Sequence, residues 1–308
     1  MFIFKKEQQA YDFGGATIGG HPGEHPNVLI GGLFFKGQEI VEDTREGRFD
    51  KDTTKVWIED GRMMGEKTGH PLIIEVYGRT AEAMRSHLSW LSENWDGPFM
   101  FESVNAAARI GGIEYCEEAG LAEKAIFNSV TLAMKDEEKD ALRQSKLDKG
   151  VVLGWSSGDT SLNDRMDTIM EALTLAGDLG IEKVLVDPAT MPIGAGYGLE
   201  FRTTLAVKSE LGLPTLLAPH NAPSAWDFLK DDEVPEEPAR FASVIAAATA
   251  AQLFATDAIM YGSMSRTKEM FTAISLTANA IFSAMNEANR AMGIDRPLFT
   301  PRSFAWGR

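Results

Sequence analysis

The sequence predicts a closed (β/α)8 barrel, because eight short apolar runs alternate with segments of helical spacing along its 308 residues. The runs are apolar throughout, which is the pattern of parallel strands that are buried on both faces. Eight strand and helix units in one chain of this length suit a barrel. The runs occupy residues 28–35, 72–77, 99–101, 125–127, 151–155, 183–186, 215–218 and 258–261.

The segments between the runs carry helix signals. Residues 80–95 and 164–180 place apolar side chains at helical spacing, and residues 105–120 and 164–180 each end at a glycine that can cap a helix. An open doubly wound sheet is the rival architecture. It would normally show a glycine-rich phosphate fingerprint after its first strand, whereas GGHPGEHP precedes the first strong run here. The barrel is therefore favoured.

The first twenty residues hold two short β-prone pieces with Gly-Gly punctuation, which indicates a β-hairpin that closes one end of the barrel. Two segments have the features of insertions into a minimal barrel: residues 37–69, with a helix over residues 52–67, and the acidic loop 227–238. Neither has the features of a domain boundary. We expect one barrel-sized domain over residues 1–308.

Composition excludes several classes of function. The net charge of -15 predicts repulsion of nucleic acids and of anionic membranes. A single cysteine cannot form an intramolecular disulfide, and the N-terminus lacks a signal-peptide pattern, so we expect a cytoplasmic protein. Polar residues interrupt the longest apolar region, residues 244–262, so we expect no membrane span.

Polar side chains follow the apolar runs, where the carboxyl ends of barrel strands build an active site. The set is acidic and rich in amides, without a cluster of histidines or basic side chains. It consists of Glu75, Glu102, Ser103, Asn128, Ser129, Ser156, Ser157, Asp187, Asn221 and Ser263.

This composition argues against four kinds of chemistry. The five histidines show no HxH or HExxH spacing and only His220 follows a strand, so we expect no metal site. The loop after the seventh run is not glycine-rich, which disfavours a sugar phosphate. No lysine follows a strand to form a Schiff base, and no GxSxG motif positions a nucleophilic serine.

Aspartate and asparagine side chains at strand ends are suited to a flat, nitrogen-rich heterocycle. A carboxylate accepts hydrogen bonds from paired N–H groups, while a carboxamide both donates and accepts. A few such residues can match the donor and acceptor edge of a pterin.

The chain also resembles a known family. IFNS after the fourth run, VLVDP at the sixth and HNAPSAW at the seventh, together with IGGHPGEHPNVLIGGLFF, EIVEDTREGRFD and WDGPFMFESVNAAARIGGIEYCEEAG, resemble the pterin-binding, corrinoid-dependent methyltransferases. The similarity covers nearly the whole chain. It is strongest to the H subunit of tetrahydromethanopterin S-methyltransferase and to its bacterial tetrahydrofolate-using relatives of glycine betaine demethylation.

This resemblance implies methyl transfer between the corrinoid (a cobalamin) of a partner corrinoid protein and N5 of a reduced pterin. Asn128 and Asp187 would bind the pterin, Asn221 would bind it near N5 and act as the catalytic residue, and Glu102 would bind the ring edge where the family pattern has Asp. No DxHxxG corrinoid motif occurs, so the corrin must arrive on the partner. Related barrels commonly pair, so we expect a homodimer.

The resemblance to the bacterial branch implies tetrahydrofolate as the co-substrate, in the direction that forms 5-methyltetrahydrofolate during methylamine or glycine betaine demethylation. Tetrahydromethanopterin is the alternative. A dihydropteroate-synthase-like barrel and a non-catalytic subunit that docks a corrinoid protein also remain open.

Each candidate residue has a purely structural interpretation. Asp187 could cap the following turn, the Asn128-Ser129 pair could begin a helix, and Asn221 could close an Asx turn. His220 is best explained as packed or bonded to the backbone, and Glu75 and Ser263 as structural residues.

Overall fold

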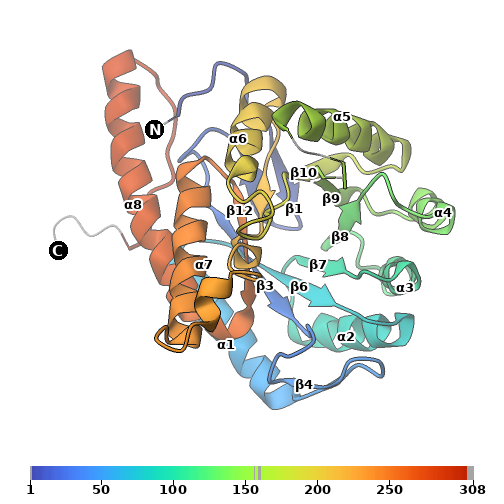
Figure 1. Ribbon diagram of the computed structural model, residues 1–308. Helices are drawn as coiled ribbons and strands as arrows, with labels where there is room; N and C mark the ends of the chain where they lie inside the picture. The colour runs from blue at the N-terminus through green and yellow to red at the C-terminus, as the bar shows by residue number, and fades with distance from the viewer. Residues whose placement is uncertain (1, 156, 159–160, 304–308) are drawn as a thin grey trace.

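The computed structural model describes residues 2–155, 157–158 and 161–303, and it shows a closed parallel barrel (Figure 1). The hydrogen-bonded order of the strands is β10-β9-β8-β7-β6-β3-β12-β11. A parallel bridge between Val186 and Thr215 joins β10 to the residue before β11 and closes the ring. The predicted (β/α)8 fold is confirmed. The barrel strands are β3 (Val28–Leu33), β6 (Leu72–Tyr77), β7 (Phe99–Glu102), β8 (Ala125–Val130), β9 (Lys149–Leu153), β10 (Lys183–Asp187), β11 (Leu216–Leu217) and β12 (Ala258–Ser263).

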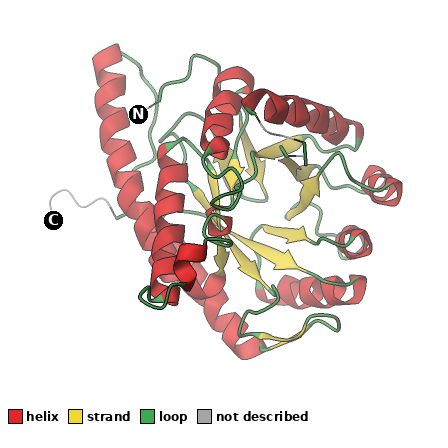
Figure 2. Cartoon of the chain, in the orientation of Figure 1, coloured by secondary structure: helices red, strands yellow, loops and turns green. Residues whose placement is uncertain are grey.

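Helices form the outer layer around these strands (Figure 2). Their ends follow the local sequence: the Asp50 carboxylate accepts from the backbone N–H groups of Asp52 and Thr53 at the start of the first helix. Gly69 ends that helix with φ 82°, a conformation that glycine adopts at little cost. The helices are α1 (Lys51–Thr68), α2 (Ala81–Asn94), α3 (Ala106–Glu118), α4 (Asp136–Gln144), α5 (Leu162–Asp178), α6 (Leu199–Ala206), α7 (Glu236–Leu253) and α8 (Thr267–Met292).

The interpretation of residues 37–69 as an insertion is wrong for most of that segment. Helix α1 is the barrel's own connection between β3 and β6, and only the small hairpin of β4 (Val41–Asp43) and β5 (Arg48–Phe49) is added before it. The many charged residues of α1 made the segment resemble an insertion. A helix that packs on a barrel needs only one apolar stripe, so most of its surface can be charged. The predicted loop 227–238 is a loop with one 3-10 turn as far as residue 235, and its last three residues are already the start of α7.

The barrel has an inner and an outer apolar layer. Side chains such as Ile73, Met100 and Ile126 fill its interior, whereas neighbours such as Ile74 and Phe101 face the helices. The N-terminal hairpin of β1 (Ala10–Phe13) and β2 (Ala16–Gly19) packs Phe13 and Ile18 into the inner layer. A Cβ on Gly14, at the tip, would contact Pro98 and Lys124, just before β7 and β8. The hairpin therefore closes the amino end of the barrel and leaves the carboxyl end, here called the mouth, for the site.

We expect Phe13→Ala to lower the free energy of unfolding by about 3–5 kcal/mol, because Phe13 is fully buried in the barrel floor. Urea unfolding followed by circular dichroism measures the loss. As a control, Leu276→Ala changes a side chain that is 75% exposed on α8 and should shift stability by about 0.5 kcal/mol or less. Equal losses of stability in the two variants would contradict the conclusion that the hairpin closes the amino end of the barrel.

Every helix among the described residues is too short or too polar to cross a membrane.

Candidate active site at the barrel mouth

Acidic and amide side chains converge where neighbouring strands end at the mouth. Inner-layer residues alternate along each strand, which places Glu75 of β6, Glu102 of β7, Asn128 of β8 and Asp187 of β10 on the inner surface. Glu102 and Asn128 are direct register partners. Electrostatic coupling links Glu75 with both Glu102 and Asp187, and Glu102 with Asp187. We call these four residues the mouth cluster.

Asn128 has a fixed orientation within the cluster. Its amide Nδ2 donates a hydrogen bond to Glu75 Oε1 at 3.0 Å. Glu75 is 1% exposed, so this contact lies away from solvent. Because its Nδ2 donates to Glu75, Asn128 keeps its Oδ1 as an acceptor for a ligand.

The carboxyl groups of the cluster have raised pKa values. Burial raises the pKa of Glu75 well above its ordinary value, and nearby Glu102 raises it further, while the Asn128 hydrogen bond lowers it. Burial raises the pKa of Glu102 to about 7 and that of Asp187 to about 7. Adjacent carboxylates with so little solvent cannot all ionise together, so the cluster holds protons near neutral pH.

A buried arginine supports the turn that carries Asp187. The Arg165 Nη1 of α5 donates to the backbone oxygens of Pro188, at 2.5 Å, and Ala189, at 3.1 Å. Asp187 Oδ1 accepts from the Ala189 backbone N–H at 2.8 Å. Ala189 has φ 62°, which is costly for a residue other than glycine, and these three contacts hold it there. The second carboxylate oxygen of Asp187, Oδ2, has no hydrogen-bond partner among the described residues.

Asn221 lies in a 3-10 turn, Pro219–Asn221, that follows β11. The backbone N–H of Ile193, in the loop after Asp187, donates to Ala222 O at 2.9 Å and ties the two loops together. The Asn221 backbone oxygen accepts from Ser224 Oγ at 2.7 Å, whereas its carboxamide has no partner in the part of the chain that the structure describes. That carboxamide is available to a ligand.

His220 is bonded to the backbone. Its Nδ1 lies 3.0 Å from Met260 O, and because a carbonyl oxygen only accepts, Nδ1 carries the proton. Burial lowers the pKa of His220, which keeps the ring neutral and leaves Nε2 as an acceptor. The structural interpretation of His220 is confirmed.

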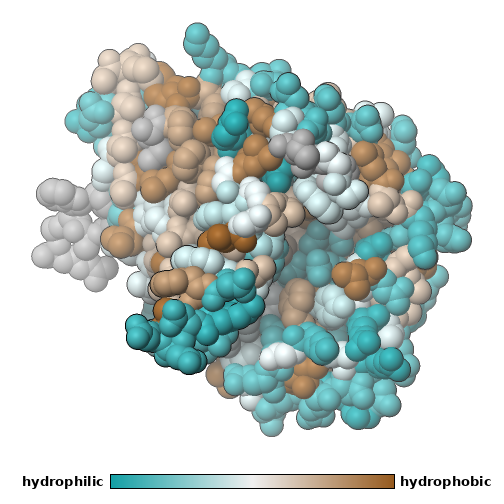
Figure 3. Space-filling view, viewed as in Figure 1, coloured by the Kyte–Doolittle hydropathy of each residue, from teal (hydrophilic) through white to brown (hydrophobic). Residues whose placement is uncertain are grey.

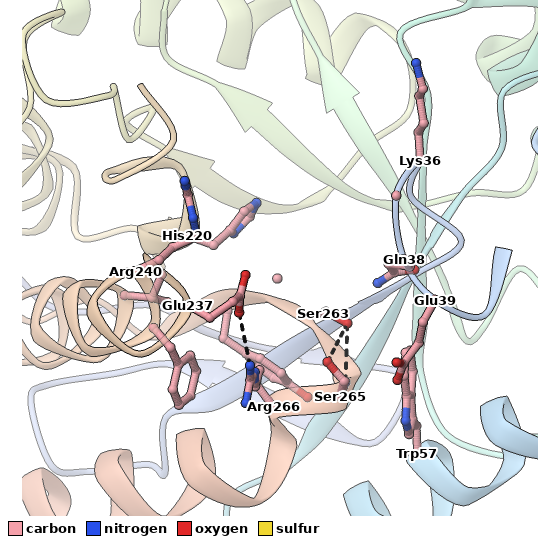
Figure 4. A pocket seen from close by; sticks show the side chains of 15 residues that line it. Lys36, Gln38, Glu39, Trp57, His220, Glu237, Arg240, Ser263, Ser265 and Arg266 are labelled. Atoms are coloured by element: carbon pink, nitrogen blue, oxygen red, sulfur yellow. Dashed lines mark hydrogen bonds and ion pairs between the residues drawn. The ribbon is translucent and has the colours of Figure 1, made fainter. Parts of the chain in front are cut away.

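A cavity of about 750 Å³ opens beside the mouth cluster, on the side of β12 and α7. It shares no residue with the cluster, and its lining includes His220, the residue before Asn221. Figure 3 shows a recess on this face, between the surfaces that cover α7 and α2. Figure 4 shows His220 and Glu237 on one side of the cavity and Gln38 and Glu39 on the other.

The other predicted rim residues have local roles or lie elsewhere. Ser103 Oγ accepts from the Asn105 backbone N–H, and Ser263 Oγ accepts from that of Ser265, as structural residues do. Ser129 is inside β8 and Ser157 is exposed. Ser156 lies outside the described residues.

The comparison with known proteins places the chain in a family. The family model described as tetrahydromethanopterin S-methyltransferase MtrH subunit matches residues 6–296. The chain belongs to the MtrH family. The H subunit of tetrahydromethanopterin S-methyltransferase from Methanothermobacter marburgensis is 36% identical over 97% of this chain and 99% of its own length. The H subunit of the putative methyltransferase mtx from Methanosarcina mazei is 34% identical over 88% of this chain and 90% of its own. The chain is thus a pterin-dependent methyltransferase of the MtrH type, as the sequence resemblance predicted.

Solved structures show the same architecture at low identity. The 7,8-dihydropteroate synthase from Vibrio fischeri superposes with TM-score 0.60 at 12% identity, covering 91% of this chain and 98% of that chain. The Yersinia pestis dihydropteroate synthase superposes with the same TM-score of 0.60 at 15% identity, covering 91% and 100%. These likenesses support the barrel fold alone.

The structure decides between the structural interpretations of the predicted site residues in this MtrH-family chain. Asp187 does cap its turn, but with one oxygen only. The Asn128-Ser129 pair does not begin a helix, because both residues lie in β8. Asn221 does not close an Asx turn, since its backbone and not its side chain makes the turn contacts.

Two residues that support the site do not stand out in the sequence. From the sequence we interpret Glu75 as a structural residue, and no motif in the sequence points to Arg165. Arg165 lies on the buried stripe of α5 with Thr168 and Ile169. An arginine on an otherwise buried helix stripe is a signal that could have identified it, because such a charge needs partners inside the protein.

We expect Glu75→Gln to stabilise the protein at pH 8 by on the order of 1–3 kcal/mol, the usual penalty for a poorly satisfied buried group. The mouth carboxyls have folded pKa values above their unfolded values. Their stabilising contribution is therefore complete below about pH 4, and it is lost as pH rises through about 7. Urea unfolding between pH 5 and 8 should show a flatter pH dependence in the variant.

The control for this experiment is Glu66→Gln, a change at an exposed position of α1. It should follow the wild-type pH dependence. A Glu75→Gln protein that loses stability at pH 8 would show that the buried carboxyl is ionised and well paired.

Proposed function

We propose that this chain moves a methyl group between a corrinoid carried by a separate protein and N5 of a tetrahydropterin. The observation that supports it most is the convergence of Glu102, Asn128 and Asp187 on one inner surface of the mouth, in a member of the MtrH family. The roles of these residues toward a pterin, and that of Asn221, are part of the proposal.

The mouth cluster suits the edge of a pterin. The free oxygen of Asp187 and the Asn128 Oδ1 accept hydrogen bonds from ring N–H groups, and a protonated Glu102 donates one to a ring nitrogen or carbonyl. Phe35 and Tyr77 stack at 5.1 Å beside this surface and give a flat ring an apolar wall. Gly32, the register partner of Glu75, adds no side chain to the inner surface.

The residues act mainly by positioning. The corrinoid supplies a methyl group bound to cobalt, and the transfer forms an N5–C bond as the Co–C bond breaks and its electron pair stays on cobalt. Holding N5 in line with that bond contributes on the order of 7 kcal/mol or more. The Asn221 carboxamide orients a water or stabilises charge at N5. An ionised carboxylate of the mouth cluster, which is only partly protonated at neutral pH, accepts the proton that N5 loses when it is methylated.

The relatives favour tetrahydromethanopterin over tetrahydrofolate, the co-substrate expected from the sequence. The curated proteins that match over most of the chain include several that are named as the H subunit of tetrahydromethanopterin S-methyltransferase. We therefore propose tetrahydromethanopterin as the co-substrate. Tetrahydrofolate is the second candidate, because the mouth cluster would bind the ring that both pterins share. The homodimer and the cytoplasmic location stay predictions.

The test is anaerobic mixing of the protein with free methylcobalamin and either pterin, following the absorbance of cob(I)alamin. We expect protein-dependent formation of cob(I)alamin with at least one pterin. A chain that demethylates methylcobalamin with neither pterin would instead support the non-catalytic docking role.

A further inference from the structure

The cavity beside the mouth cluster carries one more basic than acidic side chain in its lining, in a protein whose net charge is -15. Lys36, Arg240 and Arg266 line it together with Glu39 and Glu237, whereas the whole chain has 30 basic and 45 acidic residues. Its volume of about 750 Å³ lies within the range of small-molecule sites. A bicyclic ring held by the mouth cluster would leave this space to another part of the same ligand.

The two arginines can accept a new anionic partner. Arg240 Nη2 donates to Glu236 at 2.9 Å and Arg266 Nη2 donates to Glu237 at 3.2 Å. Arg240 Nη1 also donates to Pro223 O at 3.4 Å, and Arg266 Nη1 lies 3.8 Å from Glu269. Glu236 and Glu237 are 60% and 74% exposed, so the pairs are weak and each guanidinium keeps further N–H donors. Arg266 also lies 5.0 Å above the Phe241 ring, which holds it in place.

Lys36 provides the third cation. It follows β3 in the loop that lines the cavity, and it makes no ion pair with any residue in the described part of the chain. His220 and Gly262 both line the cavity, and a Cβ on Gly262 would lie 3.2 Å from the His220 side chain. Gly262 therefore leaves room for His220, which directly precedes Asn221 in the chain.

We propose that this cavity binds the anionic tail on the C6 substituent of the reduced pterin, with Lys36, Arg240 and Arg266 as partners for its carboxylate or phosphate groups. This inference rests on the proposed function and adds a second subsite to it. The tail of tetrahydrofolate carries carboxylates, and that of tetrahydromethanopterin carries carboxylates and a phosphate. A protein with net charge -15 repels such a tail unless local cations offset the repulsion.

The test compares ligands with and without a tail. Calorimetry measures the binding of tetrahydrofolate, tetrahydromethanopterin and 6-methyltetrahydropterin to wild type, Lys36→Ala, Arg240→Ala and Arg266→Ala. Each variant should weaken binding of the tailed pterins about tenfold and leave that of 6-methyltetrahydropterin unchanged. Unchanged binding of 6-methyltetrahydropterin thereby shows that each variant is folded. Arg143→Ala, on the exposed outer surface of α4, should change none of the affinities.

Equal weakening for tailed and tail-free pterins, or no weakening in any variant, would overturn the tail site. If the variants weaken the binding of tetrahydromethanopterin alone, the cations bind its phosphate. If they weaken the binding of both tailed pterins, the cations bind carboxylates. Failure of the proposed function shows separately, as binding of pterins without formation of cob(I)alamin.

Discussion

Asp187→Ala is expected to weaken tetrahydropterin binding at least about 100-fold. The change removes the free carboxylate oxygen that would accept from the pterin and also the cap on the Ala189 N–H. Two charge-assisted hydrogen bonds from ring N–H groups of the pterin to that free oxygen, at about 1.5 kcal/mol each, account for the loss of affinity. Asp187→Asn keeps the shape but turns an acceptor into a donor, so it should lose affinity with little effect on folding. Calorimetry with the reduced pterin measures both variants.

The same residue predicts the pH dependence of binding. Because the pKa of Asp187 is raised to about 7, the carboxylate that accepts hydrogen bonds is lost as pH falls below that value. The apparent Kd should therefore be lowest near pH 7. It should rise below that pH, by up to about tenfold per unit, as Asp187 is protonated, and rise above it as Glu102 loses the proton that it donates. Asp178→Asn, an exposed change on α5, should retain wild-type affinity and pH dependence. Wild-type affinity in Asp187→Asn would remove Asp187 from the pterin site.

Asn221→Ala is expected to lower the rate of methyl transfer about 100-fold, while pterin affinity changes by about threefold or less. The carboxamide has no partner among the described residues, so its loss leaves the fold and the mouth cluster intact. A single polar group that acts on charge in the transition state contributes about 3 kcal/mol. Single-turnover formation of cob(I)alamin gives the rate, and calorimetry gives the affinity.

Ser224→Ala is the matched control for Asn221, because it removes only the hydroxyl that supports the Asn221 backbone. It should reduce the rate by about tenfold at most. Wild-type turnover in Asn221→Ala would rule out the proposed role at N5, and equal losses of rate and affinity would make Asn221 a binding residue only.

The barrel was predictable because its strands are short and apolar throughout, and because glycines such as Gly69 and Gly180 mark helix ends or the turns after them. The polar residues at strand ends were predictable for the same reason, since a strand's last inward position faces the mouth. Glu102 and Asn128 lie where this argument places them. Helix α1 was not recognised as part of the barrel because a charged surface can belong to an ordinary barrel helix.

The rest depends on contacts between distant segments. The Glu75 contact with Asn128 spans 53 positions, and Arg165 reaches a loop 23 residues away. No local pattern reports such pairs. The cavity is likewise built from the loops after β3, β11 and β12 together with helices α1 and α7, and its three basic side chains come together only in the folded chain.

Transfer of a labelled methyl group tests the proposed reaction most directly. Methylcobalamin with a 13C methyl group is incubated anaerobically with tetrahydromethanopterin or tetrahydrofolate and the protein, and the product is followed by NMR. We predict a new 13C resonance from a methyl group on N5 of the pterin, formed by the wild type and at most at background level by Asp187→Asn. Loss of label from cobalt without its appearance on N5, or equal labelling by both proteins, would contradict the proposed reaction and the place of Asp187 in it.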